Sequence, residues 1–293
     1  MKVSPNVYLI DTRGLGFEQI VACYLVKGRK TAVVDTGYAS SGDVVYEALK
    51  TLGVEKIDYI IPTHVHLDHS GGAWKLAERF PDAIVLAHEK AVKHLVDPAR
   101  LVASVLEVYG PDILNVFGEV KPISADRVYK VSDGETLSLE DVELTFIYTP
   151  GHAPHQLSVY VSDGVLITAD AVPAKYPGKP FIIPSTPPPS FELEQYIASL
   201  RKIGGIGASA FLTPHFGQTP SGVEWTEHLI RETEKFVGEA FKAFERGGGV
   251  GTIYKALQLK VQAQFGQPLP VYAESLLKIS AMGLHEYFRR KRP

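Results

Sequence analysis

The feature that most constrains this chain is a dense group of side chains with metal-ligand chemistry. Four of them stand within six residues, directly after the apolar run 57–61: His64, His66, Asp68 and His69. Imidazoles and a carboxylate crowded at the end of a buried strand are costly unless they share a cation. Side chains alternate along an extended segment, so the first three are predicted to face one way and the fourth to follow on a turn at residues 70–72. The segment therefore predicts one wall of a metal site.

Four further segments place a carboxylate or an imidazole at the end of an apolar, strand-like run. These residues are Asp35, His152, Asp170 and His215. Taken with the first group and in this order, they resemble the signature of the metallo-β-lactamase superfamily of hydrolases, most of which use a dinuclear metal site. The resemblance extends from Asp35 to His215, which is well over half of the chain.

The resemblance implies a ligand set for each of two divalent metal ions. The first ion is assigned to His64, His66 and His152, the second to Asp68, His69 and His215, with Asp170 between both. Such a nitrogen-rich shell with a carboxylate favours Zn²⁺, although Fe or Mn could use the same ligands. Asp35 has no ligand place in this scheme. It is predicted either to orient a ligating imidazole or the ligand loop, or to cap the turn before Thr36–Gly37.

Two neighbouring cations predict hydrolysis by a metal-bridging hydroxide, formed from a water whose pKa falls toward ~7. Asp68 and Asp170 would act in catalysis through that centre. The proline-rich loop at residues 171–190 begins directly after Asp170 and is predicted to form either a substrate wall or lid, or a packing segment. Its Tyr176 is a candidate donor of a hydrogen bond to a developing oxyanion.

The substrate class follows from what stands at position 170. True β-lactamases of the superfamily usually carry a cysteine there, whereas this chain has Asp170 and its single cysteine is Cys23, far from every motif. The ligand set resembles glyoxalase II-like thioesterases and lactonases, which implies hydrolysis of carboxylic esters, thioesters or lactones of small molecules. Hydrolysis of phosphodiesters or phosphotriesters is the alternative. A di-iron redox protein and an RNA-processing nuclease are less favoured.

Composition predicts a cytoplasmic protein that acts on a small-molecule substrate. The net charge of −3 favours neither a nucleic-acid partner nor a membrane surface. The sequence shows neither an apolar secretion signal near Met1 nor an apolar run long enough to cross a bilayer. Asparagine occurs only at Asn6 and Asn115, which is a weak indication of a thermophilic source.

Alternating strands and helices predict an α/β protein. Both halves of residues 1–220 run from strands to a helix and back to a strand, so we expect two mixed sheets face to face with helices outside, a four-layer αββα sandwich. This is also the metallo-β-lactamase fold that the resemblance implies. Residues 221–293 have helical periodicity and form a predicted C-terminal extension. That extension is expected either to pack on the sandwich, to cap the pocket, or to form a homodimer surface.

Overall fold

The chain forms two compact units, each assembled from segments that are far apart in the sequence. The computed structural model describes residues 1–175, 182–265 and 269–292. The first unit holds residues 1–148, 155–169 and 208–219, and the second holds residues 149–154, 170–207 and 220–293. The predicted domain boundary at residue 220 stays a prediction.

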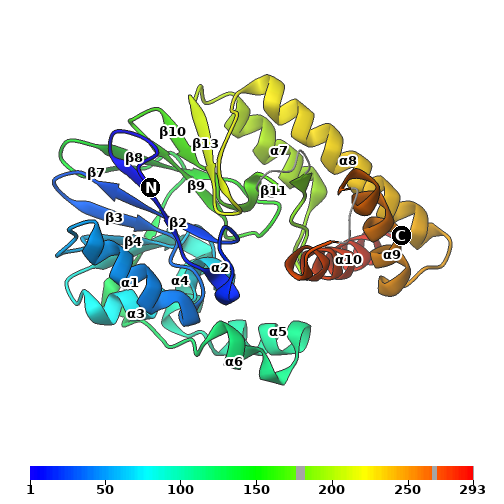
Figure 1. Ribbon diagram of the computed structural model, residues 1–293, viewed down its shortest axis with the longest axis horizontal. Helices are drawn as coiled ribbons and strands as arrows, with labels where there is room; N and C mark the ends of the chain where they lie inside the picture. The colour runs from blue at the N-terminus through cyan, green and yellow to red at the C-terminus, as the bar shows by residue number, and fades with distance from the viewer. Residues whose placement is uncertain (176–181, 266–268, 293) are drawn as a thin grey trace. The chain divides into compact units, whose positions relative to one another are not determined.

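Two six-stranded sheets form the body of the first unit (Figure 1). The first sheet runs in the order β1 (Val7–Asp11), β2 (Ala22–Lys27), β3 (Thr31–Val34), β4 (Tyr59–Ile61), β5 (Ile84–His88) and β6 (Val128–Val131). The second runs in the order β14 (Gly217–Thr219), β13 (Ala210–Thr213), β10 (Val165–Ile167), β9 (Leu157–Val161), β8 (Glu143–Tyr148) and β7 (Thr136–Ser138). Strands β3 and β4 are parallel, so their carboxyl ends lie at the same edge of the sheet.

The first sheet is buried on both faces, which explains its long apolar runs. Along β2, the side chains of Ala22, Tyr24 and Val26 enter the core that the two sheets share. Cys23 and Leu25 alternate with them and enter a second core on the helix side of the sheet. The expected burial of Cys23 is confirmed, and desolvation raises the pKa of its thiol far above the usual value. Such a thiol is a packing group rather than a nucleophile.

The helices of the first unit are α1 (Gly42–Thr51), α2 (Leu67–Ser70), α3 (Ala73–Arg79), α4 (Glu89–Val96), α5 (Ala99–Tyr109) and α6 (Leu114–Phe117). Of these, α1, α3 and α4 contribute buried residues to the second core. Helix α1 buries Val45 and Leu49 one turn apart, and a left-handed Gly53 with φ of 69° follows its end. Figure 1 shows α1 and α3 beside β3 and β4 on the same side of the sheet.

The second unit is mainly helical. Its elements are β11 (Ala174–Lys175), β12 (Ile182–Ile183), α7 (Leu193–Gly204), α8 (Val223–Glu245), α9 (Val250–Phe265) and α10 (Val271–Lys291). Helix α8 packs against α7, α9 and α10, and it buries Phe236, Ala240 and Phe244 at helical spacing. None of the helices among the described residues combines the length and hydropathy needed to cross a bilayer.

The predicted fold class, an α/β sandwich with an added C-terminal helical segment, is confirmed. One local prediction was wrong. Asp68 lies in the short helix α2 instead of continuing an extended strip, because the chain turns after His66. Within the loop at residues 171–190, β11 pairs with β12 in antiparallel orientation. Tyr176 lies outside the described residues.

Candidate metal centre

The ligand loop begins where β4 ends, next to the residue that follows β3. Asp35 is that residue, and its backbone N–H donates to Ile61 O over 3.0 Å. The loop then packs closely on residues 36–37, where Thr36 donates to His69 O through both its backbone N–H and its hydroxyl. A Cβ at Gly72 would lie 2.7 Å from Thr36 O, so this approach requires glycine. The ligand loop is therefore fixed by backbone contacts.

Asp35 is fully buried and accepts three kinds of hydrogen bond from the ligand loop. Its carboxylate accepts from the backbone N–H of Thr63 at 2.8 Å and from the Thr63 hydroxyl at 2.8 Å. It also accepts from His69 Nδ1 at 2.9 Å. A carboxylate can only accept here, so His69 carries its proton on Nδ1 and leaves Nε2 as the ring nitrogen with a lone pair. Of the two roles predicted for Asp35, these contacts correspond to orientation of the imidazole and the loop.

One cluster of the first unit joins Asp68, His69 and His215. Each offers a ligand atom within 4.8 Å of the others. The Asp68 Oδ2 atom lies 3.4 Å from His69 Nε2 and 3.4 Å from His215 Nε2. His215 follows β13, and its Nδ1–H donates to Ile20 O over 2.8 Å, which again leaves Nε2 as the nitrogen with a lone pair. The three side chains can share one cation.

The charge state of Asp68 suits a ligand. Burial by itself would raise the pKa of this carboxyl, but the positive charge and N–H donation of the His69 and His215 imidazoles in their protonated form outweigh it and hold the pKa well below its usual range. A bound cation would supply the positive charge in place of those protons. Asp68 is therefore ionised at neutral pH. An ionised carboxylate beside two imidazole nitrogens is a set of donors that divalent transition metals bind.

His64 and His66 form a second pair within the same unit. His64 Nε2 lies 3.0 Å from His66 Nδ1, and the rings of His64 and His69 are 4.0 Å apart at their centroids. His64 is fully buried, whereas His66 is half-buried. Two ring nitrogens this close to one another can turn toward a common ion.

The second unit carries the remaining pair of predicted ligands. His152 Nε2 lies 3.4 Å from Asp170 Oδ2, and both side chains are buried. His152 Nδ1 donates to Ser185 O over 3.1 Å. His152 thus resembles His69 and His215 in having one ring nitrogen bonded to an oxygen acceptor and the other beside a carboxylate. This arrangement is typical of metal-binding histidines.

Further residues with polar rings lie near these clusters. From the sequence, His155 could contact the substrate, fix the loop or lie at the surface; its ring is 6.0 Å from that of His66 and 6.2 Å from that of His94. Tyr196 is buried, and its burial, followed by the Asp170 charge, raises its pKa well above the usual range. The sequence spacing signals only His155, which follows His152 by three residues.

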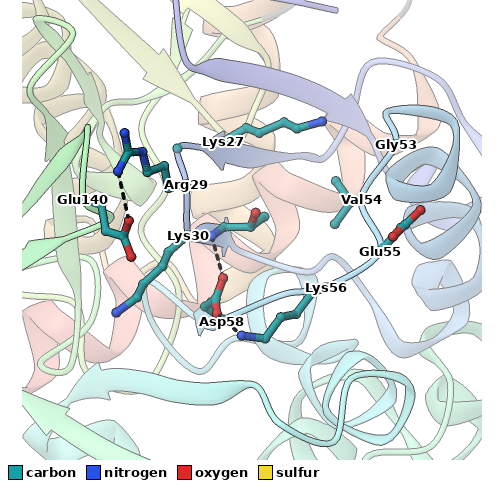
Figure 2. A pocket seen from close by; sticks show the side chains of 11 residues that line it. Lys27, Arg29, Lys30, Gly53, Val54, Glu55, Lys56, Asp58 and Glu140 are labelled. Atoms are coloured by element: carbon teal, nitrogen blue, oxygen red, sulfur yellow. Dashed lines mark hydrogen bonds and ion pairs between the residues drawn. The ribbon is translucent and has the colours of Figure 1, made fainter.

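A cavity of about 390 Å³ lies at the opposite end of β3 from Asp35 (Figure 2). It is lined by Thr31 and by charged side chains of the β2–β3 hairpin and of the segment before β4. Lys56 and Asp58 form an ion pair of 2.6 Å, and the Arg29 guanidinium lies 3.8 Å from Glu140. Four basic and three acidic side chains line the cavity, and no histidine does. The cavity is separate from the candidate metal centre.

The chain belongs to the metallo-beta-lactamase superfamily, whose family model matches residues 16–215. The metallo-beta-lactamase fold-containing protein ST1585 of Sulfurisphaera tokodaii is 33% identical over 203 residues, which cover 67% of this chain and 73% of that protein. The crystal structure of ST1585 from Sulfolobus tokodaii has a TM-score of 0.72 and 25% identity, and the match covers 97% of this chain and 98% of that one.

Two further relatives are named for two different reactions, a hydrolysis and an oxidation. A hydroxyacylglutathione hydrolase of Xanthomonas campestris pv. campestris is 29% identical over 58% of this chain and 52% of that enzyme. A coenzyme F420H(2) oxidase of Methanothermobacter marburgensis is 32% identical over 50% of this chain and 33% of that enzyme. This chain therefore spans about half of the first enzyme and a third of the second. The superfamily match and the histidine and aspartate clusters support a metal-dependent hydrolase.

Proposed function

We propose that this protein hydrolyses carboxylic esters, thioesters or lactones of small molecules with the help of two divalent cations. Zn²⁺ is the proposed identity of these cations. The observation that carries the proposal is the cluster of the buried His69 with the half-buried Asp68 and His215. Each imidazole in it has its Nδ1–H bonded to an oxygen acceptor, so its Nε2 is directed at the Asp68 carboxylate. Three potential ligand atoms this close together, two of them held by hydrogen bonds on the far side of the ring, are explained by a shared cation.

A joint centre of all seven proposed ligands is what the superfamily resemblance of the sequence implies. In the proposed centre, His152 completes the pair of His64 and His66, and Asp170 serves both ions. Metal identity, number and this joint ligand set are parts of the proposal.

The roles of the residues follow from their contacts. When bound, the cations would lower the pKa of a water toward about 7 and polarise the substrate carbonyl. Asp35 holds the proton of His69 on Nδ1, and Ile20 O does the same for His215, so both rings present Nε2 without a change of tautomer. Ionised Asp68 supplies negative charge to the same group. The only cysteine is buried with a raised thiol pKa, which disfavours cysteine nucleophilic attack.

The name of the hydroxyacylglutathione hydrolase supports the thioester part of this proposal. We expect metal-loaded protein to hydrolyse at least one lactone, ester or acyl-thioester with a kcat/KM roughly 10²-fold higher than its kcat/KM for any phosphodiester or phosphotriester. This ratio corresponds to a difference of about 2.7 kcal/mol in transition-state stabilisation. The measurement is a rate comparison over these four substrate types at one pH. Metal-depleted protein is the matched control and should show no turnover.

Two outcomes of that comparison count against the proposal. Faster cleavage of phosphoesters than of every carbonyl substrate would transfer the assignment to a phosphoesterase with the same centre. Equal rates with and without metal would remove the metal from the chemistry altogether.

A further inference from the structure

Helix α10 holds the segment that contains Ser185, within the second unit. Gly283 lies inside this 21-residue helix, where glycine costs about 0.5–1 kcal/mol relative to alanine. The reason for glycine is proximity: an added Cβ would lie 2.0 Å from Thr186 O and 2.6 Å from the carbonyl carbon of Pro187. The backbone of the segment therefore rests directly on the backbone of the helix.

Polar contacts on both sides of Gly283 strengthen this attachment. The Thr186 hydroxyl donates to Ser280 O over 3.3 Å, and the Ser280 hydroxyl donates to Pro184 O over 3.4 Å. Toward the end of the helix, Arg290 donates to Pro189 O and to Phe191 O, each over 2.7 Å. The helix thus fixes the carbonyls that precede and follow residue 185.

The carbonyl of Ser185 is the group that binds His152. His152 Nδ1 donates to Ser185 O over 3.1 Å, which leaves Nε2 on the side of Asp170. Ser185 and Thr186 are consecutive and buried, so a displacement of Thr186 from α10 moves the Ser185 carbonyl as well. A short path of contacts therefore leads from Gly283 through residues 185–186 to the His152 ring.

We propose that α10 is a positioning element for the metal ligand His152, with Gly283 as the residue that sets the position of the Ser185 carbonyl. The inference rests on the proposed function, because it assumes that His152 binds a metal ion. It assigns the C-terminal helix a role in the metal centre beyond packing. Outer partners of ligating histidines typically change metal affinity by about 10–100-fold, which gives the scale of the expected effect.

The test compares Gly283→Ala with Gly238→Ala in the full-length protein. Gly238 lies in α8, and an added Cβ there meets nothing within 4 Å, so the control adds the same methyl group to a helix without a clash. Zn²⁺ affinity is measured by competition with a chromophoric chelator. We expect one of two Zn²⁺ equivalents to bind about 10–100-fold more weakly in Gly283→Ala, with both affinities unchanged in Gly238→Ala.

A second readout separates positioning from general stability. Nitrogen NMR of the metal-free protein should show His152 as the Nδ1–H tautomer in the wild type and a mixture of tautomers in Gly283→Ala, since the Ser185 acceptor has moved. If Gly283→Ala does not fold, Arg290→Lys takes its place. Lysine retains the charge that faces Glu192 but cannot donate to Pro189 O and Phe191 O as a planar fork.

The outcomes distinguish the inference from the proposed function. A folded Gly283→Ala, or in its place Arg290→Lys, with wild-type affinity for both equivalents and an unchanged tautomer would overturn the inference alone. A wild-type protein that binds no Zn²⁺ under the same conditions would overturn both. Weakening of one equivalent together with the tautomer change supports the inference.

Discussion

Replacing Asp170 with alanine is expected to abolish hydrolysis and to lower metal content at the same time. Asp170 is buried with its Oδ2 atom 3.4 Å from His152 Nε2, and in the proposed centre its carboxylate serves both ions. Removing it leaves two neighbouring cations without the negative charge between them. We expect a loss of about 4 kcal/mol in transition-state stabilisation, which is roughly 10³-fold in kcat/KM.

The measurement combines kinetics with elemental analysis of the same preparation. Asp126→Ala is a suitable control, because Asp126 is an exposed carboxylate that precedes β6 and is no part of the clusters. That control should keep both its metal content and its rate. Turnover retained in Asp170→Ala with full metal content would contradict the role assigned to Asp170.

Substitutions at Asp35 should separate the effect of its hydrogen bonds from the effect of its backbone conformation. Asp35 has a positive φ of 60°, a region that asparagine tolerates better than alanine. Asp35→Asn keeps this shape and one acceptor oxygen, but it removes the negative charge that faces His69 Nδ1. We expect a loss of about 1–3 kcal/mol in the free energy of unfolding and roughly tenfold weaker metal binding.

Asp35→Ala removes every acceptor from the same position. The Thr63 N–H, the Thr63 hydroxyl and His69 Nδ1 would then be buried without the carboxylate they share, and the positive φ would be strained. We expect a loss of about 3–5 kcal/mol in the free energy of unfolding, measured by urea denaturation of the metal-free protein. An Asp35→Ala protein as stable as the wild type would show that the carboxylate is dispensable for the loop.

Most of the fold could be predicted because two periodicities are clear in the sequence. The predicted alternation of strands and helices begins with β1 and β2, and β2 is an apolar run that is buried on both faces. The long helices α8 and α10 followed from apolar positions three and four residues apart. These patterns survive because burial on a sheet face or a helix face fixes which residues must be apolar.

Some elements were not predicted. Helix α5 has apolar residues at helical spacing, such as Leu101, Val105 and Leu106, but none of its residues is buried. The short strands β7 and β14 have exposed residues and too few positions for alternation to be recognised. The pairing of β11 with β12 depends on backbone hydrogen bonds between residues of a proline-rich loop, which composition does not reveal.

The candidate site was predictable to the extent that side chains define it. The ligand types and their order pointed to His69 and Asp170 before any geometry was known. The groups that orient them could not be found in the same way, because Ile20 O and Ser185 O are backbone carbonyls that any residue would supply. Asp35 was the exception, since a carboxylate at a strand end is visible in the sequence. The support given to a metal ligand is therefore largely a property of the fold.

The most direct test of the central claim is anomalous diffraction from crystals of the metal-loaded protein, collected at the zinc, iron and manganese edges. The account predicts two ions per chain, with the zinc signal dominant. One ion should be bound by His64, His66 and His152 and the other by Asp68, His69 and His215, with Asp170 in contact with both. A fully loaded crystal with no anomalous peak at these side chains, or with a single ion bound elsewhere, would contradict it.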